Sequence, residues 1–126
     1  MNNFLKQTTN FLFNKETTLV SSVNLLLILN LLLHKNKNHI ILHFVIMLIY
    51  FIFSKRKDKL IIFCVYILFS LLSFFAESHI IKITNKETLQ YNSPYKINNV
   101  PFWLFSAYLG MVINIFLFYD YFKMIL

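Results

Sequence analysis

The chain has 126 residues, of which 58% are apolar and only 13% are charged. Soluble domains carry about a quarter charged residues, so this composition leaves too few polar side chains to cover a globule in water and favours a lipid bilayer. The net charge of +7 would suggest nucleic acid on a soluble protein. Here the basic residues flank apolar runs, so we expect topology signals and anionic lipid contacts and no nucleic-acid partner.

The abundance of Asn, Lys, Ile, Phe and Tyr is typical of an AT-rich genome and reports on the source rather than on chemistry. The single cysteine, Cys64, lies inside an apolar run. It allows no intrachain disulfide and no cysteine-based metal cluster. We expect no cofactor.

The N-terminal segment, residues 1–18, mixes polar and apolar side chains. Phe4, Phe11 and Leu12 are seven and eight residues apart, so they share a face if the segment is helical. Two interpretations stay open, a helix lying on a membrane surface and a frayed tail.

Four apolar runs follow, over residues 17–33, 39–53, 60–77 and 100–119. The first run ends at His34 and Lys35 without a small-residue cleavage site, so we interpret it as an uncleaved span. At 1.5 Å per residue, the last run of about 20 residues matches a hydrocarbon core of about 30 Å. The sequence therefore predicts an all-α fold, an integral membrane helical bundle with about four transmembrane helices, as a single membrane domain over residues 1–126 with a polar loop at 78–99.

An even number of spans places both termini on one side of the membrane. The terminal side then carries seven Lys and Arg residues, including the dense cluster at 55–59, against five on the other side. Because basic loops stay inside, we expect a multi-pass protein with cytoplasmic termini. A viral host membrane, a bacterial membrane and an organellar membrane remain open.

Polar residues recur at helical spacing in the third and fourth spans. The members of the two stripes are Tyr66, Ser70, Ser73 and Glu77 in the third span, and Ser106, Gly110 and Asn114 in the fourth. Ser106 and Gly110 form a small-xxx-small pair that lets a second helix approach closely. We therefore expect the third and fourth spans to pack through these faces, with a polar cavity for a substrate or an ion as the alternative.

Two histidines, His39 and His43, are four residues apart in the second span. This spacing suits a two-histidine metal pair, with His34 or Glu77 as a further ligand. The sequence has no H-E-x-x-H pattern and no Cys–His cluster, and a closed zinc site usually needs four ligands. We expect no metal here.

The stretch from Glu77 to Trp103 is the one long polar segment inside the chain. Glu77 is the only catalytic candidate, as an acid or base, and its alternative is a carboxylate that reaches the headgroup region. Tyr91, Tyr95 and Trp103 are interfacial aromatics that would line such a site. We expect Pro101 in the first turn of the last helix and a short extended piece near residues 79–84.

An acidic residue closing a span, a tyrosine-rich loop around Tyr91 and Tyr95, and a Val100-Pro101-Phe102-Trp103 opening of the last span resemble small uncharacterised multi-pass membrane proteins of bacteria and large DNA viruses. The same residues are distantly similar to the end of carotenoid-hydratase-type membrane proteins, although the glycine and tryptophan expected before Tyr91 are absent. The resemblance covers about the last 50 residues and implies membrane class only.

Three functions are weighed. The leading hypothesis is a structural, assembly or small-subunit role, with the lipid bilayer and other membrane-protein subunits as partners. The second is a membrane enzyme acting on a lipid or isoprenoid. The third is a small pore or transporter lined by polar residues of the spans, namely Asn24, Asn30, His43, Ser70 and Asn114.

Overall fold

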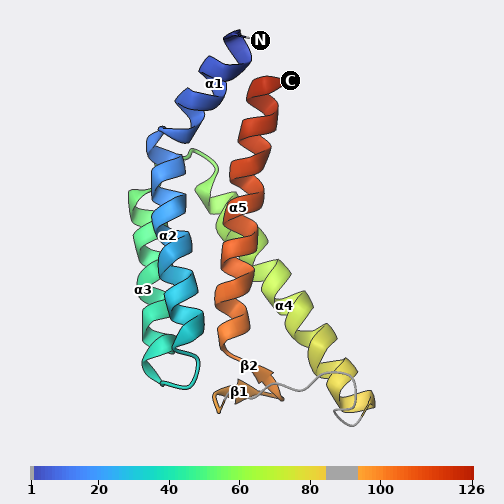
Figure 1. Ribbon diagram of the computed structural model, residues 1–126. Helices are drawn as coiled ribbons and strands as arrows, with labels where there is room; N and C mark the ends of the chain where they lie inside the picture. Colours follow the sequence, from blue (N-terminus) through green and yellow to red (C-terminus); the bar gives the residue numbers. More distant parts are fainter. Residues whose placement is uncertain (1, 85–93) are drawn as a thin grey trace.

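The computed structural model describes residues 2–84 and 94–126. Within these ranges the fold is all-α apart from one tiny hairpin (Figure 1). The elements are α1 (Asn2–Leu12), α2 (Lys15–Leu32), α3 (Asn38–Phe53), α4 (Lys59–Ile83), β1 (Lys96–Ile97), β2 (Val100–Pro101) and α5 (Trp103–Ile125). The expected all-α fold class is confirmed.

Local chemistry explains where the first apolar helix begins. Asn14 is extended and its side-chain oxygen accepts a hydrogen bond from the backbone N–H of Glu16 at 2.6 Å. This is an N-cap, which occupies one of the free donors of the first turn. Glu16 adds a negative charge at the positive end of the helix dipole, so α2 is well defined at its start.

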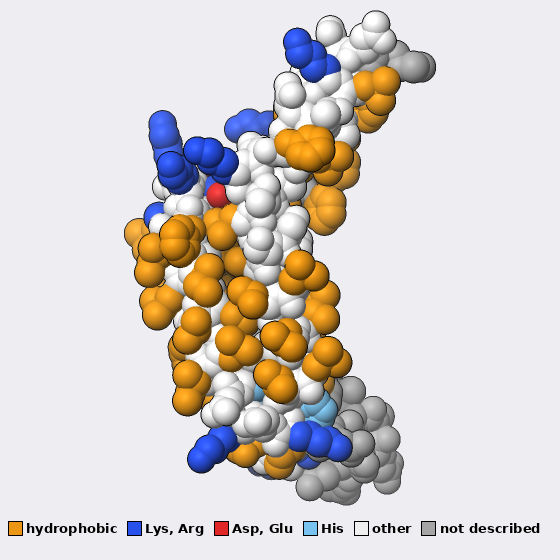
Figure 2. Space-filling model, turned by 60° about the vertical axis from the view of Figure 1, so that its left-hand side comes forward, with side chains coloured by type: hydrophobic (Ala, Val, Ile, Leu, Met, Phe, Trp, Pro, Cys, Tyr) orange, Lys and Arg blue, Asp and Glu red, His pale blue; other side chains and the backbone are white. Residues whose placement is uncertain are grey.

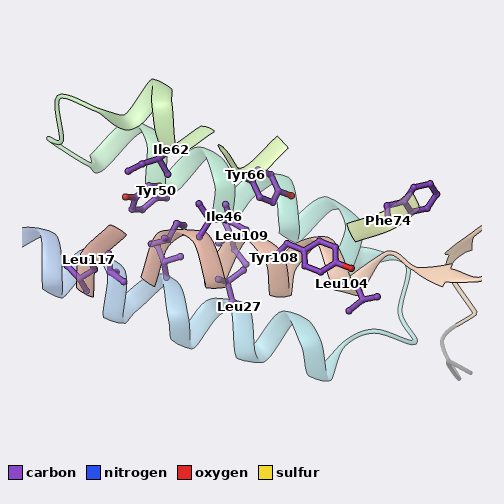
Figure 3. Packing of buried hydrophobic residues seen from close by; sticks show 14 of the residues in the cluster. Leu27, Ile46, Tyr50, Ile62, Tyr66, Phe74, Leu104, Tyr108, Leu109 and Leu117 are labelled. Atoms are coloured by element: carbon purple, nitrogen blue, oxygen red, sulfur yellow. The ribbon is translucent and has the colours of Figure 1, made fainter. Parts of the chain in front are cut away.

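α5 is the helix around which the others are arranged (Figure 1). It packs against α2, α4, α3 and α1, whereas α2 and α3 form an antiparallel hairpin beside it. α4 leans away from α3 toward the hairpin end of the molecule. The buried apolar side chains gather along α5, where Leu109 lies beside Leu27 of α2, and Leu104, Tyr108 and Leu117 belong to the same cluster (Figure 3).

The close contact of α5 is with α2. A Cβ atom placed on Gly110 would lie 3.2 Å from Cδ1 of Leu27, so the absence of a side chain permits this approach. One turn further on, Asn24 and Asn114 bond to each other twice, with N···O distances of 2.9 and 2.8 Å. The expectation that Ser106, Gly110 and Asn114 face the third span is wrong, because this face of α5 meets α2.

Three helices, α2, α4 and α5, are long and apolar enough to cross a membrane, and α3 is a shorter apolar helix. Only 22% to 39% of the residues in their apolar segments are buried inside the bundle. Figure 2 shows the outward side chains as a broad apolar band, with Lys and Arg side chains beyond it at both ends.

The polar stretch departs from the sequence prediction at both of its edges. α4 continues to Ile83, so residues 79–83 are helical rather than extended. Val100 and Pro101 form β2, and α5 begins only at Trp103. Pro101 therefore lies in a strand and not in the first turn of the helix.

The hairpin has a clear backbone cause. β1 and β2 are antiparallel, with Lys96 opposite Pro101 and Ile97 opposite Val100. The two residues of the turn, Asn98 and Asn99, have φ angles of 49° and 68°. Positive φ at both central residues defines the turn that matches strand twist, and asparagine tolerates it better than other non-glycine residues.

The N-terminal segment is helical over Asn2–Leu12, so a frayed tail is not what the structure has. α1 lies against the last turns of α5, where Phe11 meets the ring of Tyr121 at 5.0 Å and Thr8 bonds its hydroxyl at 3.1 Å. The remaining apolar side chains of this end, such as Phe4 and Phe13, are exposed.

Gly110→Leu should destabilise the bundle, because the new side chain must displace Leu27 or push α2 from α5. Overpacking of this kind costs roughly 1–3 kcal/mol. Thermal unfolding in mild detergent measures the effect. Met111→Leu is the control, because Met111 is half exposed on the outer face. Equal melting temperatures for the Gly110→Leu variant and the wild type would contradict the close packing.

Candidate functional site

The stretch from Glu77 to Trp103 places its acidic residue against α5. Glu77 accepts a hydrogen bond from the hydroxyl of Tyr108 at 3.1 Å. Tyr91 lies outside the described residues. Tyr95 precedes β1, and its carbonyl accepts the N–H of Phe102 at 2.9 Å. Trp103 opens α5 and packs against the apolar core.

Glu77 and Tyr95 contact different helices. Glu77 bonds Tyr108 of α5, whereas the ring of Tyr95 lies 5.4 Å from that of His39 on α3. Phe102 is 5.7 Å from the same His39 ring. The hairpin therefore serves as a cover over His39, which is completely buried.

Protein groups bond both ring nitrogens of His43 but only Nδ1 of His39, whose Nε2 is buried without a hydrogen-bond partner among the described residues. His39 Nδ1 lies 2.6 Å from the carbonyl of Asn36. His43 Nδ1 lies 2.8 Å from Ser106 Oγ, and His43 Nε2 lies 3.0 Å from Tyr66 OH. Within residues 2–84 and 94–126, no three His, Cys, Asp or Glu side chains are grouped so as to hold a metal ion.

The contacts of His43 belong to a hydrogen-bonded chain that draws one side chain from each of the four apolar helices. Asn30 of α2 donates to Ser106 Oγ of α5 at 2.8 Å, and Ser106 meets His43 of α3. His43 meets Tyr66 of α4, whose hydroxyl donates to the carbonyl of Phe105 at 3.2 Å. We call this set, Asn30, Ser106, His43 and Tyr66, the polar chain.

The direction of each bond in the polar chain follows from its two ends. The Asn30 amide N–H can only donate, so Ser106 accepts it and gives its own hydroxyl proton to His43 Nδ1. Tyr66 gives its proton to a backbone carbonyl, so it accepts from Nε2–H of His43. His43 is then the tautomer with its proton on Nε2, and all four members are at least 95% buried.

Ser70 and Ser73 continue the α4 stripe. Ser70 is buried one turn beyond Tyr66, and Ser73 is half-buried. The stripe meets α5 at its two ends, through Tyr66 to the carbonyl of Phe105 and through Glu77 to Tyr108. This face of α4 thus contacts the opposite side of α5 from the one that carries Gly110.

A second polar group lies at the end of the bundle that holds both termini. Arg56, in the loop between α3 and α4, is only 10% exposed and bonds both Asp58 and Asp120. The Arg56 guanidinium lies 5.8 Å from the ring centre of Phe116. Hydrogen bonding to Asp58 raises the pKa of Arg56, so this side chain stays charged.

Glu16 completes this end. Its carboxylate accepts hydrogen bonds from Ser54 Oγ at 2.9 and 3.1 Å and from Tyr50 OH at 3.2 Å, which ties the start of α2 to the end of α3. A polar cavity of about 290 Å³ opens beside these groups. It is lined by Asn14, Lys15, Glu16, Phe53, Lys55, Arg56 and Asp120.

The sequence pointed to single members of the polar chain and of the cluster around Arg56, but it did not show that these residues form groups. The sequence suggested His43 as a metal ligand or pore residue, Asn30 as a pore residue, and Tyr66 as part of a polar stripe. The sequence did contain a signal for the polar chain: each apolar span has a polar side chain at a similar depth. Polar side chains inside a bilayer must find hydrogen-bond partners, so such residues are expected to pair. For Arg56 and Asp120, 64 residues apart, a basic loop and an acidic helix end on the same side was the only hint.

Comparisons with protein-family models, with curated proteins and with solved structures found no match.

Ser106→Ala should lower stability, because Asn30 and His43 would each lose a buried partner. Leaving buried polar groups unsatisfied costs roughly 1–3 kcal/mol. The measurement is thermal unfolding in mild detergent, with Ser21→Ala as the control because Ser21 is exposed on α2. Equal melting temperatures for Ser106→Ala and Ser21→Ala would show that the polar chain does not stabilise the fold.

Acid should weaken the ion pair in the α3–α4 loop. Hydrogen bonding to Arg56 lowers the pKa of Asp58 below its usual value, so the pair stabilises the fold above a pH of about 4 and this contribution is lost as the pH falls through the folded-state pKa. Asp58 is 37% exposed, which limits the effect to below about 1 kcal/mol.

Unfolding followed between about pH 3 and pH 6 in the wild type and in Asp58→Asn measures this contribution. The wild type should be more stable than Asp58→Asn at the upper end of this pH range, and the difference in their free energies of unfolding should shrink toward the lower end. Lys57→Gln, at an exposed neighbour, should keep the wild-type profile. A constant difference between the wild type and Asp58→Asn across the range would contradict the assignment.

Proposed function

We propose that this chain is a multi-pass integral membrane protein in which α2, α3, α4 and α5 cross the bilayer. The support is the apolar band in Figure 2 and the three helices of membrane-spanning length. α3 has 16 residues, or about 24 Å, which is short for a core of about 30 Å. Lysines at both of its ends, Lys37 and Lys55, can reach the interface from a short span.

The proposed orientation has both termini and the α3–α4 loop in the cytoplasm. These three parts lie at one end of the bundle in Figure 1. The loop carries Lys55, Arg56, Lys57 and Lys59 within five residues, and basic residues in short loops are retained on the cytoplasmic side.

The proposed role is structural: a small subunit or assembly factor that packs against other membrane helices. The observation that carries it is the use of the interior polar groups. Asn24 bonds Asn114, Asn30 bonds Ser106, and His43 bonds both Ser106 and Tyr66. Groups engaged in this way hold helices together instead of lining a path for ions, while the outer faces stay apolar and available for neighbours.

The crossing pattern can be tested by labelling single cysteines from one side of sealed vesicles, in a Cys64→Ser background. Cysteines at Lys57 and Lys123 should react from the same side, and one at Asn36 only from the other side. These positions are in loops or at helix ends. If α3 did not cross, cysteines at Asn36, Lys57 and Lys123 would all react from the same side.

The structural role predicts a stable complex with another membrane protein. The tagged chain, extracted in mild detergent, should co-purify with one polypeptide at a fixed ratio through affinity and size-exclusion steps. Substituting an outward residue of a span with a bulkier apolar one, such as Leu68→Trp, should weaken the complex without altering thermal stability, because Leu68 is 60% exposed and tryptophan is tolerated in lipid. Recovery of the chain as a lone monomer would contradict the role.

A further inference from the structure

An apolar groove lies on the outer face of the described part of the chain, between α3 and the start of α4. Its volume is about 480 Å³. It is lined by Phe44, Met47, Leu48, Phe51, Lys59, Leu60 and Phe63. The two helices diverge from their connecting loop (Figure 1), and the rings of Phe51 on α3 and Phe63 on α4 lie 5.4 Å apart.

The single charged group of the groove is held in place. Lys59 Nζ donates to the carbonyls of Phe51 and Ser54 at 2.9 and 3.1 Å. These carbonyls fix the ammonium but carry no formal charge, so its positive charge remains. Two of its three N–H groups are engaged by these bonds, and the third can serve an oxygen of a ligand.

The surroundings of Lys59 are basic. Lys55 and Lys57 are exposed in the adjoining loop. The nearby carboxylates are Asp58 and Asp120, which Arg56 engages, and Glu16, which Ser54 and Tyr50 engage. The loop end of the groove therefore favours a negatively charged group, whereas the rest of its lining is apolar.

The charge in the lining argues for an anionic lipid as the occupant. The lining of α3 runs from Phe44 to Phe51, about 10 Å at 1.5 Å per residue. Lys59 lies at the Phe51 end of this apolar lining, because its ammonium bonds the carbonyl of Phe51. A hydrocarbon chain with a negatively charged group at one end matches an apolar groove with a cation at one end.

We infer that this groove is a binding site for an anionic phospholipid. One acyl chain lies along Phe44, Leu48 and Leu60, and the headgroup phosphate meets Lys59, with Lys55 and Lys57 favouring a net negative headgroup. The inference rests on the proposed membrane location. The groove would bind one lipid that is selected by its charge, whereas the other lipids around the protein exchange freely.

The test uses the full chain in nanodiscs of phosphatidylcholine with a minor fraction of phosphatidylglycerol, followed by native mass spectrometry of the lipids that stay bound after release. The wild type should retain phosphatidylglycerol above its share of the disc. Lys59→Gln should weaken this retention about fivefold. Leu48→Trp, which fills the groove, should abolish it.

Matched controls separate the groove from general effects. Lys37→Gln removes an exposed charge at the opposite end, and Ile52→Trp adds the same ring as Leu48→Trp at an exposed α3 position outside the groove; both should retain phosphatidylglycerol. Leu48 is itself 61% exposed, so its replacement should leave the melting temperature unchanged.

Retention of the two lipids in proportion to the disc, or retention that neither Lys59→Gln nor Leu48→Trp reduces, would overturn the lipid site while leaving the membrane location intact. A cross-linked protein chain in the groove in place of lipid would also overturn it. Failure of the chain to enter nanodiscs at all would instead remove the proposed membrane location, and the lipid site with it.

Discussion

The rotation of the four apolar helices relative to one another depends on one buried arrangement, the polar chain of Asn30, Ser106, His43 and Tyr66. Each member comes from a different apolar helix, and each donates in the same direction until the last proton reaches the carbonyl of Phe105. Apolar side chains alone would allow the four helices to rotate or slide, since one leucine-rich face packs much like another. Directional bonds at one depth fix the rotation of all four helices at once.

Two further sets of contacts lie along α5 and explain why this helix is central to the bundle. Toward the end with the termini, the Asn24–Asn114 pair and Gly110 hold α5 close to α2. At that end itself, Arg56 joins the α3–α4 loop to Asp120 of α5. In a bilayer, where lipid replaces water, single interhelical hydrogen bonds contribute only about 0.6 kcal/mol on average. The stability of the bundle therefore comes from several hydrogen bonds and ion pairs along α5 together, and no single one of them accounts for it.

The sequence predicted the helices well and their partners poorly. Apolar runs and their polar ends determine where helices form, so α2, α3 and α5 were close to expectation. Gly110 and Ser106 were correctly identified as small residues that admit a neighbour, but chain order suggested α4 as that neighbour. The real neighbour, α2, is 76 to 90 residues away in the chain, and no local pattern encodes such a pairing.

The remaining errors have local physical causes. The abundance of asparagine was attributed to an AT-rich genome, yet the positive φ angles of Asn98 and Asn99 form the hairpin turn, and α5 begins only at Trp103. The spacing of His39 and His43 suggested metal, but burial near Ser106 and Tyr66 gives the ring of His43 two protein partners. Glu77 was proposed as a site candidate, and its bond to Tyr108 depends on an arrangement of α4 on α5 that periodicity alone does not define.

The protonation pattern of His43 tests the polar chain most directly. Nitrogen-15 NMR of the chain with labelled histidine in lipid bilayers distinguishes a protonated from an unprotonated ring nitrogen, and the signals that disappear in His43→Gln are those of His43. The account predicts an unprotonated Nδ1 that accepts from Ser106 and a protonated Nε2 that donates to Tyr66. A proton on Nδ1, or His43 signals that do not respond to Ser106→Ala, would contradict it.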